Sequence, residues 1–393
     1  MLKVLSGNKA AVYGAKLARV EVAAVYPITP QSQISEDITK VVAAGELDCD
    51  IIEVEGEHSA MSAIIGASTV GARTFTATSS WGLAYMNEPL MVCAGMRIPA
   101  VMVDVTRETP AQRGVSTSRQ DVMTVRDCGW LELDPASPQE VLDCVLMAYR
   151  LAEDPEILLP VMVASDGFYM SHAYEPVDVP TQEQVDKFLA PVSGCKRTTF
   201  TDGKSMQFDV GYSGPNFVKY RYQTMKAIEK AKEKFPQIEK EFEEIFGRKY
   251  GGMVEEYFSG DAEIVLMTAG SASGNAKAVV DCARNEYGLK VGLIRERMFR
   301  PYPKEELRRI LAGKKAVGII DRSICVGWDC GHLMQETKAA LFGMENAPKL
   351  VNFIDGLSSM DITIEHVERA LAITMAAAKG EQVDECHWLS WED

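Results

Sequence analysis

Strand-like apolar runs alternate with helical segments along most of this chain, and this alternation limits its fold more than any other feature. The runs at 99–105 (PAVMVDV) and 158–165 (LLPVMVAS) contain few polar residues. Strands of this composition are buried on both faces, as they are in a parallel sheet that helices cover on two sides. The sequence therefore predicts an α/β protein built on parallel sheets.

The alternation occurs in two separate stretches, which indicates two domains. It runs through residues 1–180 and resumes in a smaller stretch that we place at 259–393. Residues 181–258 begin Pro-rich and polar and continue, over 217–247, as a helical pattern rich in Lys and Glu that Pro236 should interrupt. We expect a connecting helical segment there.

The charge of the chain argues against two classes of partner. There are 56 Asp and Glu residues against 41 Lys and Arg, which gives a formal charge of −15. Such a surface repels phosphate backbones and anionic lipids, and no apolar run approaches the roughly 20 residues of a membrane span. We expect neither nucleic acid nor a membrane as a partner.

The cysteines indicate reduced thiols in a cytoplasmic protein. Nine are spread along the chain without a CxxC pair, and no secretory signal follows Met1. The nearest pair, Cys325 and Cys330, lies close to Asp329 and His332 and could suggest a metal site. Its spacing differs from that of structural zinc sites, so we expect no metal on this chain.

Ligands of α/β proteins bind where parallel strands end, so the strand–helix junctions are the candidate site. The first follows the strand at 21–26, where Thr29 is placed to cap a helix and Pro30 to begin it. The free N–H groups of such a helix end can hold an anion such as a carboxylate. An ordinary helix cap is the simpler interpretation of Thr29.

Glu57 stands at the second junction. It opens a helix whose Met61, Ile64 and Ile65 should face the core, so its carboxyl group is expected to point into the crevice at the strand ends. Glu55, still on the strand, is expected to be buried. The alternative is that Glu57 only interacts with the helix dipole, as acidic residues of a first turn often do.

Two further junctions carry hydroxyl groups and a cation. Ser79 and Ser80 are small, so a ligand can approach the backbone there. Arg107 follows an apolar strand, and its guanidinium group can bind a carboxylate through two parallel hydrogen bonds. The alternative for Arg107 is a surface ion pair with Glu108.

Together, these junctions resemble the α subunit of pyruvate:ferredoxin oxidoreductases and the wider 2-oxoacid:ferredoxin oxidoreductase family. The resemblance rests on YPITP (26–30), VEGEHSAM (54–61), FTATSSWGL (75–83), the arginine after VMVDV, QDVMTVRDCGW (120–130) and FRPYP (299–303). It covers almost the whole chain. It implies an N-terminal thiamine-diphosphate domain of the pyrimidine-binding type and a C-terminal domain like the last domain of transketolases.

The resemblance also implies roles for individual residues. Glu57 matches the glutamate that contacts N1′ of the aminopyrimidine and so assists removal of the C2 proton. Thr29 matches the threonine beside the reacting carbon, and Arg107 matches the arginine that recognises the substrate carboxylate. Further cofactor contacts are expected from Pro27, Ile28, Ser79 and Ser80.

The implied reaction converts pyruvate, coenzyme A and oxidised ferredoxin to acetyl-CoA, CO2 and reduced ferredoxin. Another 2-oxoacid, whether branched-chain, 2-oxoglutarate or oxalate-like, is the alternative, because Trp81 and the stretch 112–119 depart from the pattern of pyruvate-specific relatives. Arg113 and Arg119 in that stretch either serve a larger or more acidic substrate or solvate a loop. A scaffold subunit without activity is a further alternative.

Partner chains are expected to complete the active site. The family's GDG segment for diphosphate and Mg2+ is matched here only by SDG (165–167) and IDG (354–356), without the asparagines that should follow. The resemblance therefore implies a β-type subunit that shares thiamine diphosphate and holds Mg2+ and a [4Fe-4S] cluster. It also implies γ- and δ-type ferredoxin-like subunits or fusions, coenzyme A as co-substrate, ferredoxin as acceptor and a dimer of hetero-oligomers. GSASGN (270–275) is either a phosphate-binding helix start or a tight turn.

Overall fold

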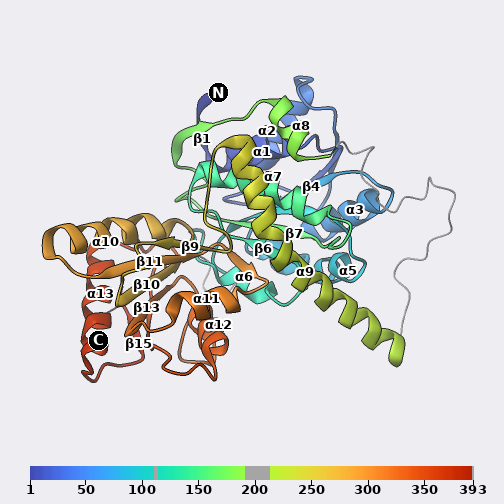
Figure 1. Ribbon diagram of the computed structural model, residues 1–393. Helices are drawn as coiled ribbons and strands as arrows, with labels where there is room; N and C mark the ends of the chain where they lie inside the picture. The colour runs from blue at the N-terminus through green and yellow to red at the C-terminus, as the bar shows by residue number, and fades with distance from the viewer. Residues whose placement is uncertain (110–113, 191–212, 392–393) are drawn as a thin grey trace.

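Two sheets with helices on both faces form the protein. The computed structural model describes residues 1–109, 114–190 and 213–391 (Figure 1). The first sheet has the strand order β12-β6-β7-β5-β4-β2-β3, and the second has the order β15-β14-β13-β10-β11-β9. A separate antiparallel pair joins β1 (Leu2–Ser6) to β8 (Tyr174–Asp178).

The first sheet is parallel except at one edge. Its parallel strands are β2 (Val22–Val25), β3 (Asp50–Glu53), β4 (Thr74–Thr78), β5 (Val101–Thr106), β6 (Leu131–Leu133) and β7 (Val161–Asp166). The strands β4, β5 and β7 are buried along their whole length. The expected α/β class is therefore confirmed, with the apolar runs at the centre of the sheet.

A different set of helices covers each face of this sheet. One face packs against α1 (Gly7–Leu17), α2 (Ser32–Ala43) and α7 (Pro138–Ala152). The other packs against α3 (Glu57–Thr69), α4 (Trp81–Tyr85), α5 (Asn87–Gly95) and α6 (Gln120–Val125). The second face shares its core with residues of the second sheet, so the two domains are packed together without a gap in the apolar contacts.

The second sheet is smaller and also mixed. Its parallel strands are β10 (Ile264–Ala269), β11 (Val291–Glu296), β13 (Ala316–Asp321), β14 (Lys349–Ile354) and β15 (Cys386–Trp388). The helices α10 (Ser273–Tyr287) and α13 (Ile364–Lys379) cover one face. The helices α11 (Lys304–Leu311) and α12 (His332–Leu341) cover the face turned toward the first domain.

Two antiparallel edge strands were not expected from the sequence. β9 (Val254–Tyr257) pairs with β11 of the second sheet, although it lies in the segment assigned to the connection. β12 (Met298–Arg300), which contains the first two residues of the FRPYP motif, leaves the second domain and pairs with β6 of the first sheet. The pairing of β12 with β6 places Glu296, at the end of β11, next to the first domain and connects the two domains by backbone hydrogen bonds.

The connecting segment contains α8 (Gln182–Phe188) and a long helix, α9 (Pro215–Phe246). The interruption predicted at Pro236 is wrong, because α9 continues through that residue. Its buried residues recur every three or four positions (Ala227, Ala231, Phe235, Ile238, Phe242, Phe246), and they pack with α7 and α8. This packing outweighs the single backbone hydrogen bond that a proline removes.

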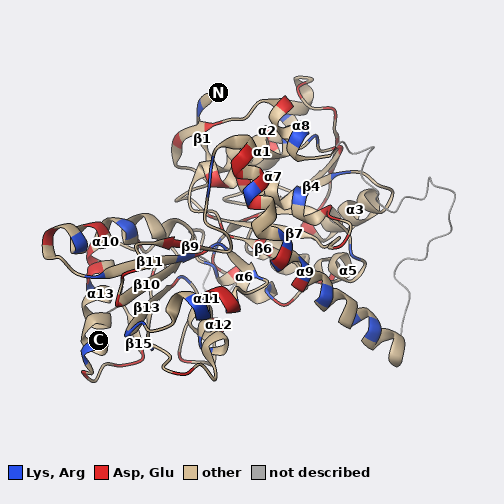
Figure 2. Ribbon diagram, viewed as in Figure 1, with Lys and Arg blue, Asp and Glu red and all other residues tan. Residues whose placement is uncertain are grey.

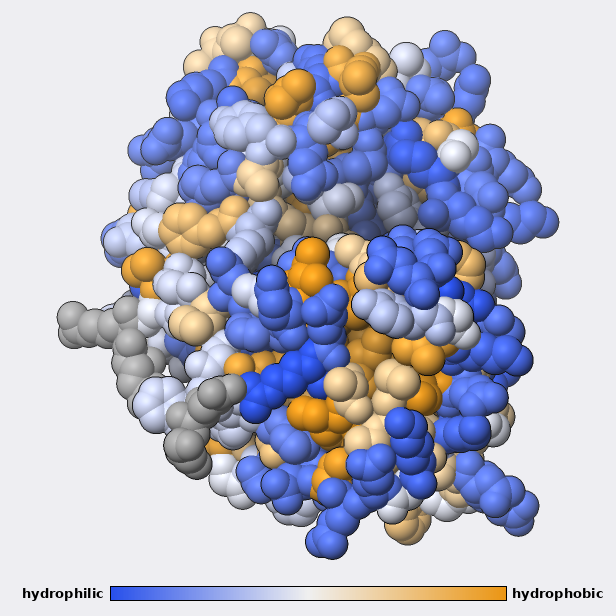
Figure 3. Space-filling view, turned by 90° about the vertical axis from the view of Figure 1, so that its left-hand side faces the viewer, coloured by the Kyte–Doolittle hydropathy of each residue, from blue (hydrophilic) through white to orange (hydrophobic). Residues whose placement is uncertain are grey.

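The surface differs from one end of the molecule to the other. Along the free end of α9, the coloured residues are lysines and arginines (Figure 2), although the chain as a whole is acidic. The face seen in Figure 3 is mostly hydrophilic and is recessed where its upper and lower parts meet. Within the described residues, no helix is both long and apolar enough to cross a membrane.

Candidate active site

Four neighbouring strands carry the predicted site residues at the same edge of the first sheet. In the order β5-β4-β2-β3, every neighbouring pair is parallel. The segments that follow these strands contain Arg107, Ser79 and Ser80, Thr29, and Glu57. The fold therefore brings together residues that are separated by up to 78 positions in the sequence.

Thr29 lies in a loop that other residues hold in place. Asn8 donates from Nδ2 to the Pro30 carbonyl oxygen at 2.9 Å, and the Gln31 N–H donates to the Ile28 carbonyl at 2.7 Å. Pro27 and Thr29 are exposed, and the Thr29–Pro30 peptide bond is cis. The predicted helix cap at Thr29 is wrong, since α2 begins at Ser32, and its preceding residue Gln31 caps it with no side-chain hydrogen bond.

Gln31 explains why the loop ends where it does. It is fully buried, its Oε1 accepts the Ile28 N–H at 3.3 Å, and its Nε2 donates to Ser35 Oγ at 2.7 Å. The side chain thus connects the loop to the first turn of α2. As a result, Thr29 is free of the capping role and presents its side chain at the surface of the site.

Glu57 is the first residue of α3, as expected, and its side chain is buried, with 7% of its surface exposed. Among the described residues, no other side chain donates a hydrogen bond to its carboxyl group. Burial raises the pKa of this carboxyl, and the residue's own backbone N–H partly opposes the shift. The sequence left the direction of this shift open, and the burial of Glu57 in the structure favours an upward shift.

Gly82 makes room for the Glu57 carboxyl group. A Cβ atom at this position would lie 2.5 Å from Glu57 Oε1 and 2.3 Å from Thr78 Oγ1, which are impossible contacts. Any side chain at position 82 would therefore displace the carboxyl group. Glu55, by contrast, is exposed and accepts a hydrogen bond from Ser59, so its expected burial is wrong.

Ser79 and Ser80 form a sharp turn at the end of β4. Ser80 has a φ of 46°, a strained conformation for a residue other than glycine. Its Oγ donates to the Glu108 carbonyl oxygen. Ser79 Oγ and Thr78 Oγ1 are buried without a hydrogen-bond partner among the described residues, so this turn offers two polar atoms to a ligand.

Arg107 is directed toward the Thr29 loop. Its Nη1 donates to the Thr29 carbonyl oxygen at 2.9 Å, and its Nε donates to the Gly114 carbonyl at 2.8 Å. The surface ion pair with Glu108 is not formed, because Glu108 Oε1 instead accepts hydrogen bonds from the backbone and hydroxyl of Thr109. Burial lowers the pKa of Arg107 without removing its charge.

Asp121 is a site residue that the sequence reasoning missed. Its Oδ2 accepts the N–H groups of Ser80 at 2.9 Å and Arg107 at 2.8 Å, so one buried carboxyl group joins two of the site segments. The residue belongs to the QDVMTVRDCGW motif. The signal was an acidic residue within an otherwise apolar turn, but no spacing rule indicated what it contacts.

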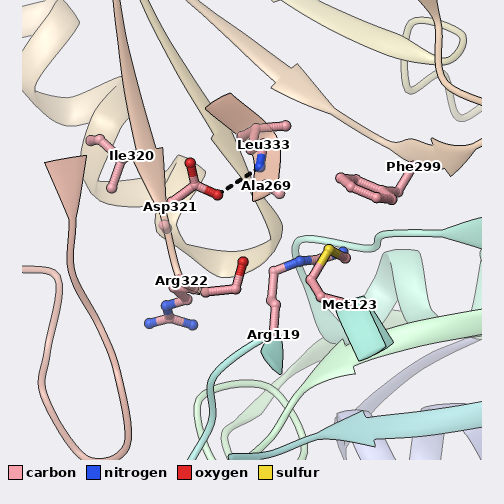
Figure 4. Close-up of a pocket in the computed structure, with 10 residues that line it drawn as sticks. Arg119, Met123, Ala269, Phe299, Ile320, Asp321, Arg322 and Leu333 are labelled. Atoms are coloured by element: carbon pink, nitrogen blue, oxygen red, sulfur yellow. Dashed lines mark hydrogen bonds between the residues drawn. The ribbon is translucent and has the colours of Figure 1, made fainter. Parts of the chain in front are cut away.

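Arg119 has neither of the roles expected of it. It is buried where the domains meet, and its Nη2 lies 2.6 Å from Asp134 Oδ2 and 3.2 Å from Glu132 Oε1. It lines a cavity of about 10 Å³, room for about one water, opposite Asp321 and Arg322 (Figure 4). Arg113, the other arginine in question, lies outside the described residues.

The remaining candidates take part in structural contacts. Asp166 of the SDG segment accepts hydrogen bonds from the Ser271 N–H and hydroxyl and from Arg322. GSASGN forms a short 3-10 helix (Gly270–Ala272) and the start of α10, and these contacts hold it against the first domain. Asp355 of the IDG segment contacts His366 and Ser390. His332 pairs with Ser323, and the described residues hold no group of three His, Cys, Asp or Glu side chains suited to a metal.

This arrangement suits the aminopyrimidine of thiamine diphosphate. A buried carboxyl group without a protein donor can share a proton with a ring nitrogen. The unpartnered hydroxyl groups of Thr78 and Ser79 lie on the strand-end segment that Gly82 brings against this carboxyl group. The residues present therefore fit one half of the cofactor.

Fold and site together define a class of protein, the thiamine-diphosphate-dependent α/β enzymes. Residues 13–244 match the family described as "Pyruvate flavodoxin/ferredoxin oxidoreductase, thiamine diP-bdg", and residues 262–367 match "Pyruvate:ferredoxin oxidoreductase core domain II". The chain belongs to the 2-oxoacid:ferredoxin oxidoreductase family, in which it corresponds to the α subunit. The resemblance found in the motifs is confirmed.

Curated relatives match nearly the whole chain. The chain is 39% identical to the α subunit of an NADH-dependent phenylglyoxylate dehydrogenase from Aromatoleum evansii, covering 98% of this chain and 94% of that one. It is 41% identical to pyruvate synthase subunit PorA of Pyrococcus horikoshii (98% and 97%). It is 44% identical to ketoisovalerate oxidoreductase subunit VorA of the same organism (93% and 92%).

Solved structures support the fold at lower identity. The 2-oxoglutarate:ferredoxin oxidoreductase of Magnetococcus marinus superposes with a TM-score of 0.71 at 19% identity, covering 94% of this chain and 65% of that longer chain. A split-gene transketolase superposes with a TM-score of 0.56 at 14% identity, covering 96% and 100%.

Proposed function

We propose that this chain, assembled with partner subunits, oxidatively decarboxylates pyruvate with coenzyme A to acetyl-CoA and CO2 and passes the electrons to ferredoxin. The observation that carries the proposal is Glu57. It is a buried carboxyl group with a raised pKa, it has no protein donor among the described residues besides its own N–H, and it fits there because Gly82 has no side chain.

Glu57 is the catalytic residue in this proposal. Thiamine diphosphate, when bound, supplies a carbon nucleophile for the substrate ketone. Glu57 would hold a proton against N1′ of the aminopyrimidine. Its raised pKa favours this role, because proton sharing is most effective when the pKa of the side chain approaches that of its partner and the working pH. Pro27, Ile28, Ser79 and Ser80 would form the wall around the ring.

Thr29 and Arg107 would bind the substrate. One guanidinium group beside one neutral hydroxyl orients a single carboxylate without holding it so tightly that its loss as CO2 is slowed. Arg119, which a second substrate carboxylate would need, is already paired with Asp134 and Glu132. These contacts support a monoanionic 2-oxoacid over 2-oxoglutarate or oxalate.

A branched-chain 2-oxoacid is the second candidate substrate. The relative with 44% identity is named for ketoisovalerate, and another is named for phenylglyoxylate, so relatives at similar distance act on side chains of different size. All three named substrates carry one carboxylate beside the ketone. A scaffold role is disfavoured by the buried Glu57 carboxyl group, whose desolvation cost a ligand would offset.

The other groups of the reaction would belong to partner chains. The described thiols of Cys49, Cys128, Cys330 and Cys386 are protonated at neutral pH, since burial raises the pKa of each to about 11 or 12. This supports a β-type subunit that holds Mg2+, diphosphate and a [4Fe-4S] cluster, with γ- and δ-type subunits leading to ferredoxin. A dimer of such hetero-oligomers in the cytoplasm is the proposed form.

The test is turnover by the copurified complex. Viologen reduction that depends on both pyruvate and coenzyme A is expected, with Glu57→Gln lowering kcat/KM at least about 100-fold and Arg107→Ala raising KM for pyruvate. A panel of pyruvate, 2-oxoisovalerate, phenylglyoxylate and 2-oxoglutarate then ranks the substrates. An unchanged rate in both variants contradicts the site, and a complex inactive with every 2-oxoacid contradicts the function.

A further inference from the structure

Two buried carboxyl groups meet directly behind the site. Asp104 on β5 is 0% exposed and Asp121 on α6 is 2% exposed. Their side chains are within hydrogen-bonding contact of each other. Two ionised carboxylates in such a place would repel each other strongly, so one of them must carry a proton.

The hydrogen-bond partners identify which carboxyl group is ionised. Asp121 accepts the N–H groups of Ser80 and Arg107 through Oδ2 and the N–H of Val122 through Oδ1, at 2.8–2.9 Å. Three such donors stabilise a negative charge. Among the described residues, neither oxygen of Asp104 accepts a hydrogen bond. Asp104 is therefore the neutral acid that donates its proton to Asp121.

Charged groups from several elements face the pair. Glu132 of β6 faces Asp104, and burial and Asp134 raise the pKa of Glu132 to about 8, so it adds negative charge only as the pH rises; Arg119 opposes it. Glu108 and the Arg107 guanidinium face Asp121 from the end of β5. Burial and mutual repulsion raise the pKa of both carboxyl groups, so the pair keeps one proton at neutral pH.

We propose that Asp104 and Asp121 form a one-proton clamp that positions the active site, with Asp121 holding the Ser80 turn and the start of the Arg107 loop at a fixed separation. This rests on the proposed function, since Arg107 is the proposed carboxylate ligand. Both aspartates are positioning residues. They lie behind the backbone that carries the ligand-binding groups and touch those groups only through it.

The clamp has a consequence for the pH dependence of the enzyme. Removing its proton places two negative charges side by side in a buried site, and the carboxyl groups must then separate. Ser80 and Arg107 lose their common anchor, so the affinity for the 2-oxoacid is expected to fall as the pH rises. Asp104→Asn keeps a neutral donor toward Asp121 at every pH and should remove this dependence.

The first experiment uses the copurified complex. For wild type, KM for the preferred 2-oxoacid is expected to rise at least 5-fold between pH 7 and pH 9, whereas Asp104→Asn keeps KM within 2-fold over that range. Asp121→Ala should raise KM at least 10-fold at pH 7 and lower kcat less. Asp143→Asn is the matched control: Asp143 on α7 is equally buried, but it binds Arg248 and Tyr250, which follow α9, and KM should not change.

The second experiment does not depend on turnover. Hydrogen–deuterium exchange of the peptides that contain the Ser80 and Arg107 amides is compared at equal pH in wild type, Asp104→Asn and Asp143→Asn. Equal protection is expected at pH 6, and at pH 9 wild type should exchange at least 5-fold faster than Asp104→Asn. Asp143→Asn should behave as wild type.

The outcomes separate the two proposals. If the wild-type complex turns over no 2-oxoacid, the proposed function fails, and the exchange experiment still decides whether the clamp exists. If the complex is active but Asp104→Asn shows the wild-type rise in KM and the wild-type exchange at pH 9, the clamp is wrong. A poorly folded Asp121→Ala leaves this decision to Asp104→Asn.

Discussion

In both domains, helices begin where parallel strands end, but the second domain fills the start of α12 with a side-chain carboxylate of its own, whereas the first leaves the start of α3 open. In the second domain, the Asp321 carboxylate at the end of β13 accepts the N–H groups of Leu333 at 2.8 Å and Met334 at 3.1 Å, at the start of α12. Asn352 within β14 donates to the same carboxylate and accepts the Gly331 N–H. In the first domain, α3 begins at Glu57 with no side-chain cap.

The difference shows how one fold can serve structure or ligand binding. A helix that begins at a strand end offers free N–H groups and a favourable field for an anion. Where the chain supplies the anion itself, as at Asp321, the position is closed and stabilises the fold. Where it does not, as at Glu57 and the Ser79 turn, polar atoms remain for a ligand.

The largest predicted effect is a loss of stability at the closed end, which we define as the end of β13 where Asp321 caps α12. Asp321→Ala leaves the buried N–H groups of Leu333 and Met334 without an acceptor and removes one of the two acceptors of the Asn352 amide, so it is expected to lower the free energy of unfolding by about 3 kcal/mol. Chemical denaturation of the complex measures it, and Asp321→Asn should recover part of the loss. Activity per folded molecule should stay near wild type. A variant of normal stability with reduced activity would show that the second domain's strand ends belong to the active site.

The second prediction concerns acid lability, which should arise at the same closed end. Burial, with help from Arg126 and Arg300, lowers the pKa of His332 to about 4, below its ordinary value of 6.5. The unfolded chain binds this proton first, so the stability is complete above pH 6.5 and is lost as the pH falls toward 4. Between pH 7 and pH 5 the loss is about 2 kcal/mol.

Asp321 acts in the opposite direction and must be separated from His332. Its pKa is raised to about 6 by burial, so its own contribution to stability falls as the pH rises from about 3.8 to 6. The quantity to measure is therefore the difference in unfolding free energy between wild type and His332→Asn at each pH. This difference should fall by about 2 kcal/mol from pH 7 to pH 5. A constant difference would mean that His332 does not cause the acid lability.

The third prediction addresses the open end. Arg107→Lys cannot keep the hydrogen bonds to Thr29 and Gly114 and also present a fork to a carboxylate. We expect KM for the 2-oxoacid to rise about 10-fold, or about 1.4 kcal/mol, with a smaller change in kcat. The control is Arg19→Lys, an exposed arginine paired with Asp186 away from the site. An equal effect of the two substitutions would remove Arg107 from substrate binding.

The sequence predicted the parallel strands well because burial on both faces leaves a continuous apolar run. It failed where pairing is set by distant parts of the chain. Nothing local distinguishes β12 from a loop, since three residues after Glu296 pair with β6 more than 160 positions earlier. Likewise, Pro236 reads as a helix break until the packing of Phe235 and Ile238 is known.

The sequence predicted those site residues that come soon after a parallel strand, because ligands bind at strand ends. Glu57, Thr29 and Arg107 were placed by this rule, and the structure brings their segments to one edge of the sheet. Asp104 and Asp121 were not found, because an acidic residue in a buried strand or turn gives no signal of which N–H groups it meets. The burial of Arg119 was missed for the same reason, since its partners Glu132 and Asp134 lie on another strand end.

The smallest predicted effect concerns the contact between the two domains' strand-end loops, those that follow β14 and β5. Ser359, in the loop after β14, shares a hydrogen bond of 2.7 Å with Ser116 in the loop that follows Arg107. The pair is exposed, so water replaces either partner, and such bonds contribute about 1 kcal/mol or less. Ser359→Ala should therefore change KM for the 2-oxoacid less than about 3-fold. In a double-mutant cycle with Ser116→Ala, the effects of the two substitutions on KM should be additive. A coupling well above 1 kcal/mol would show that the second domain helps to set the Arg107 loop, and the closed domain would then take part in substrate binding after all.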